Sequence, residues 1–425
     1  MKNDKRDIWL DAAEHDPALM ADFGALCAFG GRLAGTPEEA AAMAWAIARM
    51  AEIGGEVRRV EVPYDGWRCL SASLALEGGA TLACKPLLRS ASTPAEGLSG
   101  EVIDLGAGRT EDFDRVGDAV RGRIVLVRHE YPFSPRHMHR RRKYDLAVAR
   151  GAAGFLIANP LPGRGLLSGS SGRAVDGAGI PAAYIDDASC QALVAAGPHA
   201  RVRLFVAGEE LRGSQAGIGV LDLPGGSGRS IVISAHMDGH DLGQSALDNA
   251  TGVAVALAAA RALAPRIGAG THGLRVCLFS AEEWALAGSA QYLAAMEPAE
   301  RDRLALDINL DTVAGDERLT ALISDFPGLA PFVAGAAAAS GVPVDSYLPL
   351  MPNSDHANFA RHDIPALRLV AGFDREDSRV NHILGGGDVP AVVEETELRR
   401  ALRVTCAMAD AALAMSDEAL AGLRR

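Results

Sequence analysis

The sequence predicts an α/β fold in which a mixed, mostly parallel sheet lies between two layers of helices, with a smaller β-rich unit inserted. Two observations support this prediction. In residues 211–425, short apolar runs that look like buried strands alternate with helical segments, as in a sheet flanked by helices. Residues 67–210 carry short β-type runs broken by glycine and proline, which indicates a separate unit.

Residues 1–66 form the first of three regions along the chain. In GTPEEAAAMAWAIARMAEIGG, Thr36 and Glu39 have the spacing of a helix capping box, and the alanine-rich run after them favours a helix. Gly54 and Gly55 are expected to end that helix. EVRRVEVPY then alternates as a strand does.

The inserted unit, residues 67–210, contains the strand-like runs GRIVLVRH, GFLIANP and IPAAYID. We expect a helix at about 136–150, between the first two runs. The stretch GLLSGSSGRAVDGAG has the composition of an exposed loop. These features predict a small α+β or β-rich domain.

Residues 211–425 are expected to form the main part of the larger domain. Its predicted strands are the apolar runs SIVISAH, GLRVCLFSA, LALDINLD and IPALRLV. Helical segments such as NATGVAVALAAARALA lie between them. This alternation predicts crossover connections and therefore a largely parallel sheet.

Composition excludes several classes of protein. A formal net charge of −12 argues against a general nucleic-acid binder, which needs a basic surface. The six cysteines form no CxxC pair, so we expect no cysteine-based zinc site and a reducing compartment. The N-terminus lacks the apolar core of a signal peptide, and no stretch resembles a charge-free transmembrane span. We therefore expect a cytoplasmic protein with no membrane partner.

Histidines and carboxylates follow the predicted strands of the last region where each strand ends. These residues are His236, Asp238, Glu282, Glu283, Asp311 and, in the loop after the last strand, His382; Asp248 precedes the helix near Asn249. In open α/β sheets, sites form outside the carboxyl ends of the strands. Imidazole and carboxylate are ligands for zinc, cobalt or manganese, and dications would offset the repulsion among buried carboxylates.

Four segments carry a resemblance to a known family. SAHMDGH, SALDNATG, FSAEEWALAGS and INLDTVAGD resemble the bacterial two-zinc aminopeptidases and their relatives, which include glutamate carboxypeptidase and glutaminyl cyclase. The resemblance covers residues 1–66 and 211–425. Residues 67–210 resemble a protease-associated domain through GRIVLVRH, ARGAAGFLIAN and IPAAYI. The resemblance implies a zinc exopeptidase-like fold with this domain inserted.

The resemblance also implies a set of metal ligands. His236 and Asp311 would bind one Zn²⁺, Glu283 and His382 would bind a second, and Asp248 would bridge the two. Co²⁺ or Mn²⁺ could replace zinc at such ligands. The family usually shows Tyr-His-Thr where this chain has Asn-His-Ile around His382. If His382 is not a ligand, the second metal is weakly bound or absent.

The same resemblance implies two catalytic or supporting roles. Glu282 would be the general base that takes a proton from the attacking water and gives one to the leaving amine. Asp238 would hydrogen-bond the ring of His236 and so orient it.

A rival family has the same order of ligands. Deacylases related to succinyl-diaminopimelate desuccinylase place the bridging aspartate much further along the chain, whereas Asp248 here follows His236 by 12 residues. Those enzymes also carry a dimerising lid after the Glu-Glu pair, whereas this chain carries its insertion before His236. The aminopeptidase type is therefore favoured.

Three further features have alternative interpretations. Ser354, Asp355 and His356 either match a family segment on the specificity side or cap the N-terminus of a helix. His240 is interpreted as a loop histidine that reaches solvent. A basic run is interpreted as a solvated helix face, with a clamp for a substrate carboxylate as the alternative. The run consists of Arg136, His137, His139, Arg140, Arg141, Arg142 and Lys143.

The predicted function is metal-dependent hydrolysis of peptide or small amide bonds by an aminopeptidase-type exopeptidase. The alternatives are an amidohydrolase of N-acyl amino acids or other non-peptide amides, a glutaminyl cyclase-like acyl transferase, and a non-catalytic binding protein on the same scaffold. The expected partner is a peptide or small amide substrate, and a homo-oligomer is left open.

Overall fold

The computed structural model describes the backbone of residues 2–424 and the side chains of residues 8–424. The chain divides into two compact units. The larger unit comprises Met1–Tyr64, Gln215–Ile383 and Asp388–Arg425, and the smaller unit comprises Asp65–Ser214 and Leu384–Gly387. In sequence, the smaller unit is thus an insertion into the larger one.

A mixed sheet forms the centre of the larger unit. The pairs β14–β11, β11–β9, β9–β10 and β12–β13 are parallel, and β12–β14 and β10–β8 are antiparallel. Every residue of β10, β11 and β14 is buried, as expected for strands covered on both faces. The prediction of a mixed, mostly parallel sheet is confirmed. In spatial order the strands are β13 (Val344–Tyr347), β12 (Leu319–Leu322), β14 (Ala366–Ala371), β11 (Leu304–Leu310), β9 (Ser230–His236), β10 (Gly273–Phe279) and the end of β8 (Arg201–Leu223).

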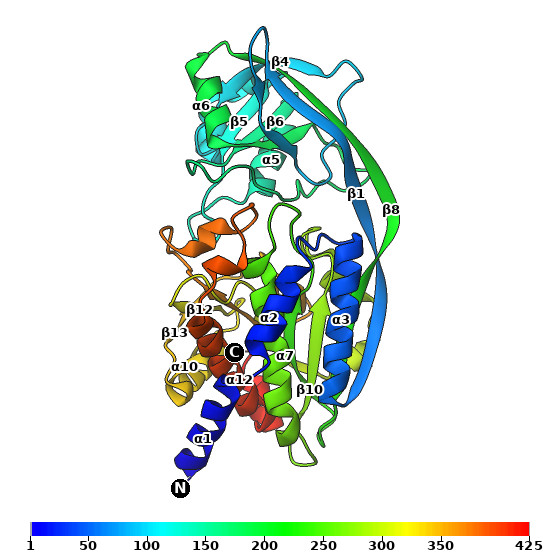
Figure 1. The fold of residues 1–425 in the computed structure, drawn as a ribbon, viewed down its shortest axis with the longest axis vertical. Helices are drawn as coiled ribbons and strands as arrows, with labels where there is room; N and C mark the ends of the chain where they lie inside the picture. The colour runs from blue at the N-terminus through cyan, green and yellow to red at the C-terminus, as the bar shows by residue number, and fades with distance from the viewer. Residues whose placement is uncertain (1, 425) are drawn as a thin grey trace. The chain divides into compact units, whose positions relative to one another are not determined.

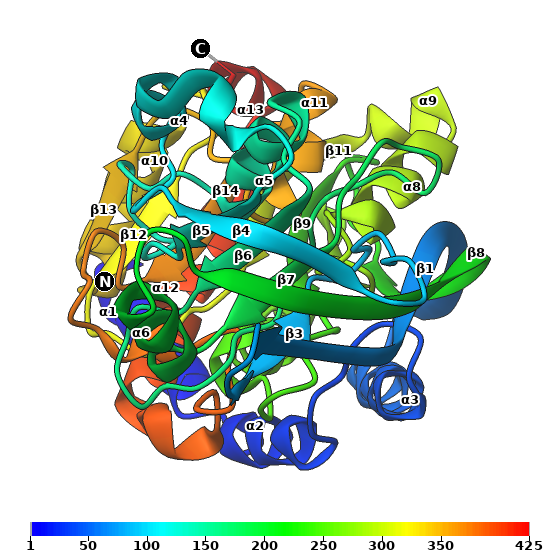
Figure 2. The same ribbon diagram turned by 90° about the horizontal axis from the view of Figure 1, so that it is seen from above.

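Helices cover this sheet on both faces. The chain passes from β9 through α7 (Thr251–Leu263) to β10, and then through α8 (Ala287–Ala295) back past β9 to β11. Because parallel crossovers are right-handed, two connections that run in opposite directions along the sheet place α7 and α8 on opposite faces. Helix α12 (Glu395–Leu413) packs beside α7, and α11 (His356–Arg361) packs beside α8. Figure 2 shows α8 and α11 on the other side of these strands from α2 and α12, which confirms the three-layer arrangement.

The remaining helices of the larger unit pack around this core. Helix α2 lies against α7, as Figure 1 shows, and α1 and α10 contact α12. Their bounds are α1 (Lys2–Glu14), α2 (Leu19–Ala28), α3 (Pro37–Ile53), α9 (Pro298–Arg301), α10 (Leu329–Ser340) and α13 (Asp417–Gly422).

Helix α3 begins and ends where the sequence predicts. The Thr36 hydroxyl accepts a hydrogen bond from the Glu39 N–H at 3.3 Å, and Gly54 follows the helix with a φ of 98°. The strand after it, β1 (Glu56–Leu76), is longer than EVRRVEVPY, which ends at Tyr64. It continues because it pairs with β8, which also runs from one unit into the other.

The smaller unit is built on short buried strands. Strands β4, β5, β6 and β7 lie side by side in this order, and each is parallel to the next. Strand β3 pairs with β7 and is antiparallel to it. The predicted strands GRIVLVRH, GFLIANP and IPAAYID correspond to β5, β6 and β7. Their bounds are β2 (Thr81–Leu82), β3 (Cys84–Pro86), β4 (Leu98–Asp104), β5 (Ile124–Arg128), β6 (Gly154–Ala158) and β7 (Ala182–Ile185), and the helices are α4 (Thr110–Val116), α5 (Arg140–Ala149) and α6 (Asp187–Ala195).

One helical segment of the described residues, Ala246–Arg266, is long and apolar enough to cross a membrane by length and composition. Its apolar window is 89% buried within the protein. It contains α7, which packs on β9, β10 and β11, so its apolar character is accounted for by the core of the larger unit.

Candidate metal centre

The register of the parallel strands brings the predicted site residues to one edge of the sheet. His236 is the last residue of β9 and is aligned with Phe279, the last residue of β10. Glu282 and Glu283, which follow β10, therefore lie at the same edge of the sheet as His236. Asp311 directly follows β11, which is the neighbour of β9 on its other side.

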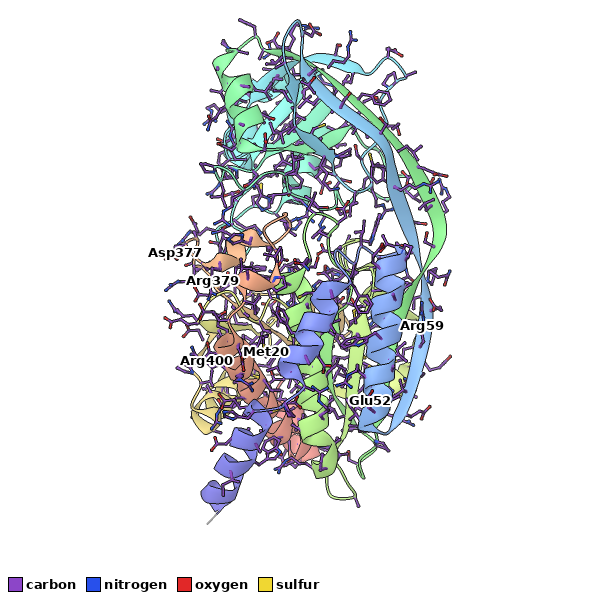
Figure 3. The ribbon with its side chains drawn as sticks, in the orientation of Figure 1. Met20, Glu52, Arg59, Asp377, Arg379 and Arg400 are labelled. Atoms are coloured by element: carbon purple, nitrogen blue, oxygen red, sulfur yellow. The ribbon has the colours of Figure 1, made fainter. Side chains whose placement is uncertain are left out.

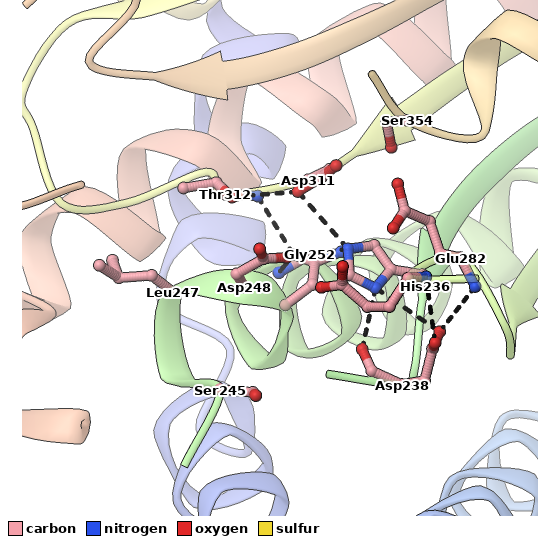
Figure 4. A network of polar contacts seen from close by, with 12 residues as sticks. His236, Asp238, Ser245, Leu247, Asp248, Gly252, Glu282, Asp311, Thr312 and Ser354 are labelled. Atoms are coloured by element: carbon pink, nitrogen blue, oxygen red, sulfur yellow. Dashed lines mark hydrogen bonds and ion pairs between the residues drawn. The ribbon is translucent and has the colours of Figure 1, made fainter. Parts of the chain in front are cut away.

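His236 lies at the centre of the cluster (Figure 4). Its Nε2 lies 3.1 Å from Asp248 Oδ1 and 3.6 Å from Asp311 Oδ1. The site contains two groups of three residues, and within each group the ligand atoms lie within 4.8 Å of one another. One group is His236, Asp248 and Glu283, and the other is His236, Glu282 and Asp311. An imidazole nitrogen that faces several carboxylate oxygens at this spacing is an arrangement that a divalent cation can occupy.

The electrostatics of the cluster also fit a cation. Burial raises the pKa of Glu282 well above its usual value, and Glu283 and Asp311 add to the rise while His236 opposes it. Burial alone would lower the pKa of His236, but Glu282 and the neighbouring aspartates raise it well above the usual value. So many buried carboxylates around one imidazole carry excess negative charge, which a bound dication would offset.

The structure changes the role expected of Asp238. Its carboxylate accepts hydrogen bonds from the backbone N–H groups of Glu282 and Glu283, at 3.0 Å and 3.2 Å. The ring of His236 instead donates from Nδ1 to the backbone carbonyl of Asp238, at 2.9 Å, and the carboxylate lies 3.8 Å away. Asp238 thus fixes the Glu-Glu pair with its side chain and His236 with its main chain.

His240 is buried, which contradicts the interpretation of a histidine that reaches solvent. Its Nε2 lies 2.7 Å from Glu283 Oε2, and the residue is 3% exposed. The backbone of His240 is also tightly packed, because a Cβ on Gly31 would lie 2.2 Å from the His240 carbonyl oxygen. Only a residue without a side chain allows that close approach.

His382 lies outside both groups of ligand atoms found among the described residues. It ends the short helix Arg379–His382, where Arg379, labelled in Figure 3, pairs with Glu394 at 2.9 Å and also with Glu397 in α12. These pairs anchor the turn to α12. The assignment of His382 as a ligand stays a prediction.

The segment Ser354–His356 is fully buried and does not cap a helix through its side chains. Helix α11 begins at His356 with no side-chain hydrogen bond from Asp355 to its first turn. Instead, Ser354 Oγ donates to Asn309 Oδ1 at 2.9 Å, and Asp355 accepts from Ser289. The capping interpretation is therefore wrong, and the segment forms a buried polar network behind Asp311.

Two buried arginines support the cluster, and the sequence patterns did not identify either of them as a site residue. Arg368 Nη2 lies 3.1 Å from Asp311 Oδ2. Arg32, which is fully buried, donates to five backbone carbonyl groups on three segments. The acceptors are the carbonyl oxygens of Met237, Leu26, Gly30, Gln244 and Ser245. A charged residue inside an apolar run, as in IPALRLV, was the available signal for Arg368.

Asp388 also supports the cluster through the backbone. Its carboxylate accepts from the N–H groups of Leu247, at 2.6 Å, and Asp248, at 3.3 Å. These bonds fix the backbone of the turn before α7 and so determine the position from which the Asp248 side chain extends.

Comparisons with known proteins agree with this architecture. Residues 220–407 match the profile of peptidase family M28, and residues 80–193 match the PA domain. The chain is 26% identical over 294 residues to a probable lipoprotein aminopeptidase, LpqL, of Mycobacterium tuberculosis. The alignment covers 67% of this chain and 55% of that protein. It is 27% identical over 357 residues to aminopeptidase YwaD of Bacillus subtilis, matching 81% of this chain and 73% of that protein.

The fold resembles that of solved aminopeptidases. A zinc aminopeptidase from Bacillus subtilis aligns with a TM-score of 0.75 at 22% identity, over 95% of this chain and 96% of that one. The profile matches, the inserted unit and the shared fold together lead to one conclusion: residues 220–407 match peptidase family M28, and the unit inserted before them matches the PA domain.

Proposed function

We propose that this chain is a metal-dependent hydrolase of peptide or small amide bonds, of the aminopeptidase type. The observation that carries the proposal is the pair of buried ligand groups that share His236, one with Asp248 and Glu283 and the other with Glu282 and Asp311, at the carboxyl edge of the sheet. Both relatives named above are called aminopeptidases. The activity is a proposal because the chain spans only 55% of the length of the first of these relatives.

We propose zinc as the metal, with two ions per chain. His236 and Asp311 would hold one ion, Glu283 and His382 the other, and Asp248 would lie between them. The zinc aminopeptidase of Bacillus subtilis, which shares this fold, supports the choice of zinc. When bound, such ions polarise a scissile carbonyl group and lower the pKa of a coordinated water.

Glu282 is the proposed general base. Its carboxyl lies in the group with His236 and Asp311, and its backbone is fixed by Asp238. Burial raises its pKa, which brings a carboxyl group closer to the range where it both accepts and returns a proton at neutral pH. It would take a proton from the attacking water and deliver it to the leaving amine.

The test compares Glu282→Gln with Glu283→Gln. We expect the Glu282 variant to keep its metal and lose turnover by about 100-fold or more, since general acid–base catalysis contributes roughly that much. The Glu283 variant should lose metal. Metal content by mass spectrometry and activity on aminoacyl-anilides, dipeptides and N-acyl amino acids are the readouts. Near-normal turnover by the Glu282 variant would refute the assigned base.

The substrate panel also separates the alternatives. Hydrolysis of N-acyl amino acids alone would indicate an amidohydrolase. A glutaminyl cyclase from Porphyromonas gingivalis has a related fold, with a TM-score of 0.50 at 14% identity, so cyclisation of N-terminal glutamine belongs in the panel. No turnover and no bound metal would favour a binding protein. The cytoplasmic location stays a prediction, and one relative is named a lipoprotein.

A further inference from the structure

Two cations of the basic run serve the fold of the smaller unit. Arg140 is buried and donates from Nε to the Ser170 carbonyl oxygen at 3.0 Å. Lys143 is fully buried and lies 2.6 Å from Glu130. The interpretation of a solvated helix face is thus wrong for these two residues, and both are already engaged within the unit rather than with a substrate carboxylate.

A serine and a histidine of the larger unit form a separate hydrogen-bonded pair at the other end of its sheet. Ser227 lies in the turn between β8 and β9, and His272 directly precedes β10. Strands β9 and β10 are aligned at their first residues, Ser230 and Gly273, whereas His236 is the last residue of β9. The pair therefore lies at the amino edge of these strands, and the metal centre lies at the carboxyl edge.

The Ser227 hydroxyl group faces the imidazole of His272. Its Oγ lies 2.5 Å from Nδ1, while Nε2 on the other side of the ring lies 2.8 Å from the Met415 carbonyl oxygen. Because a carbonyl oxygen can only accept a hydrogen bond, Nε2 carries the proton of the neutral imidazole. The lone pair of Nδ1 therefore faces Ser227, and the hydroxyl group donates to it.

Backbone contacts fix both the histidine and the turn that carries the serine. The His272 N–H donates to the Leu413 carbonyl oxygen at 2.9 Å, and the Gly226 N–H donates to the Thr271 carbonyl oxygen at 2.9 Å. A Cβ on Gly225 would lie 2.3 Å from the carbonyl carbon of His272. Only a residue without a side chain allows that close approach, so the turn and the histidine are packed in one arrangement.

Ser227 has the features of an activated nucleophile. It is exposed, whereas His272 is only 4% exposed. Its Oγ accepts one hydrogen bond, from the Arg229 N–H at 3.1 Å, which leaves a second lone pair for attack. The next residue, Gly228, donates to no backbone carbonyl among residues 8–424, and the space where its Cβ would lie is open.

These groups match the parts that acyl transfer requires. A nucleophile beside a base that is oriented by a third group is the arrangement by which serine hydroxyl groups are activated. The Met415 carbonyl oxygen is the orienting group here. The N–H of the residue after the nucleophile, as in Gly228, is a donor that hydrolases use for the oxyanion.

We propose that Ser227 is a nucleophile that hydrolyses small carboxylic esters, with His272 as its general base. The Ser227 Oγ bonds to the acyl carbon as its proton passes to Nδ1, and the bond to the alcohol breaks as that proton passes to the leaving oxygen. Water then attacks the acyl group with the same base, which releases the acid and restores the hydroxyl group. These steps use no residue of the metal centre, so the proposal does not depend on the proposed peptidase activity.

The first test treats the metal-loaded full chain with p-nitrophenyl acetate and locates acetyl groups by peptide mass spectrometry. Ser227 should be acetylated about 100-fold faster than Ser346, an exposed serine of β13, because general base catalysis contributes at least that much. Ser227→Ala should lower the release of nitrophenol and leave the hydrolysis of aminoacyl-anilides unchanged, and Ser346→Ala should change neither. Equal acetylation of the two serines, or normal nitrophenol release by Ser227→Ala, would overturn the proposal.

The second test examines the base with the imidazole in place, because His272 also holds the turn. In Ser227→Cys, iodoacetamide should alkylate position 227 about tenfold faster than it alkylates position 346 in Ser346→Cys. The reason is that an adjacent imidazole favours the thiolate, which is the reactive form of the thiol. Peptide mass spectrometry measures both rates. Equal rates would show that His272 does not take the proton and would contradict its role as the base.

Discussion

Arg368 Nη2 lies 3.1 Å from Asp311 Oδ2, with both side chains buried. Burial raises the pKa of Asp311, but Arg368 and His236 together hold it well below the usual range, so Asp311 is an anion in the folded protein. A candidate metal ligand thus has its own internal cation, which stabilises its charge whether or not a metal is bound.

Arg368→Met should destabilise the metal-free protein more than the zinc-loaded protein. Without Arg368 the Asp311 charge is buried and uncompensated, which costs about 3–5 kcal/mol, whereas a bound metal compensates it. Denaturant unfolding with and without a chelator measures both values. An equal loss in the two states would mean that Arg368 acts through packing alone.

Arg32→Lys should weaken both folding and metal binding. A lysine offers three donors in place of the guanidinium, so several of the five carbonyl groups would lose their partner, at about 1–3 kcal/mol each. The segments that lose these bonds flank Asp238 and Asp248. Urea unfolding and zinc titration are the measurements, and Arg203→Lys is the exposed control. Unchanged zinc affinity with normal stability would contradict this role.

His240→Asn and His382→Asn should have different effects on metal content. His240 contacts Glu283, and partners of this kind typically change metal affinity by about 10–100-fold, so its variant should bind the second ion more weakly. The His382 variant should lose one of two ions outright. Metal content before and after dialysis distinguishes these outcomes, with the exposed His362→Asn as control. Wild-type metal content in His382→Asn would remove His382 from the ligand set.

Glu39→Gln should change how stability depends on pH. Burial raises the pKa of Glu39 to about 7 from 4.5. Because the folded state binds this proton more tightly than the unfolded state, the contribution is present below pH 4.5 and is lost as the pH rises through about 7.

The variant should therefore be more stable relative to the wild-type chain at pH 8 than at pH 5, by up to roughly 3 kcal/mol. Urea unfolding at both values measures the difference. A constant difference across this range would show that Glu39 is ionised throughout.

Strand positions followed from the sequence because the central strands are buried on both faces and read as unbroken apolar runs. The clustering of His236 and Asp311 followed because adjacent parallel strands end at one edge. Both inferences use only local patterns and one rule of sheet geometry.

The environments of His240 and Arg368 could not be inferred in that way. His240 is buried with its ring against Glu283, and its backbone lies against Gly31, which is distant in sequence. Arg368 occupies a buried strand because Asp311, which directly follows the neighbouring strand β11, balances its charge. Likewise, the orientation of His236 by a backbone carbonyl depends on the path of the loop after β9. Such relationships require the folded path of the chain.

The pairing of β1 with β8 has a consequence for how easily the smaller unit can be exchanged. The chain leaves the larger unit at Tyr64 and returns at Gln215, on two strands that are hydrogen-bonded neighbours. A tight hairpin turn could join them at that point without disturbing the sheet of the larger unit. A chain that lacks residues 65–214 would therefore keep a continuous backbone, so the smaller unit could be removed or exchanged as a whole.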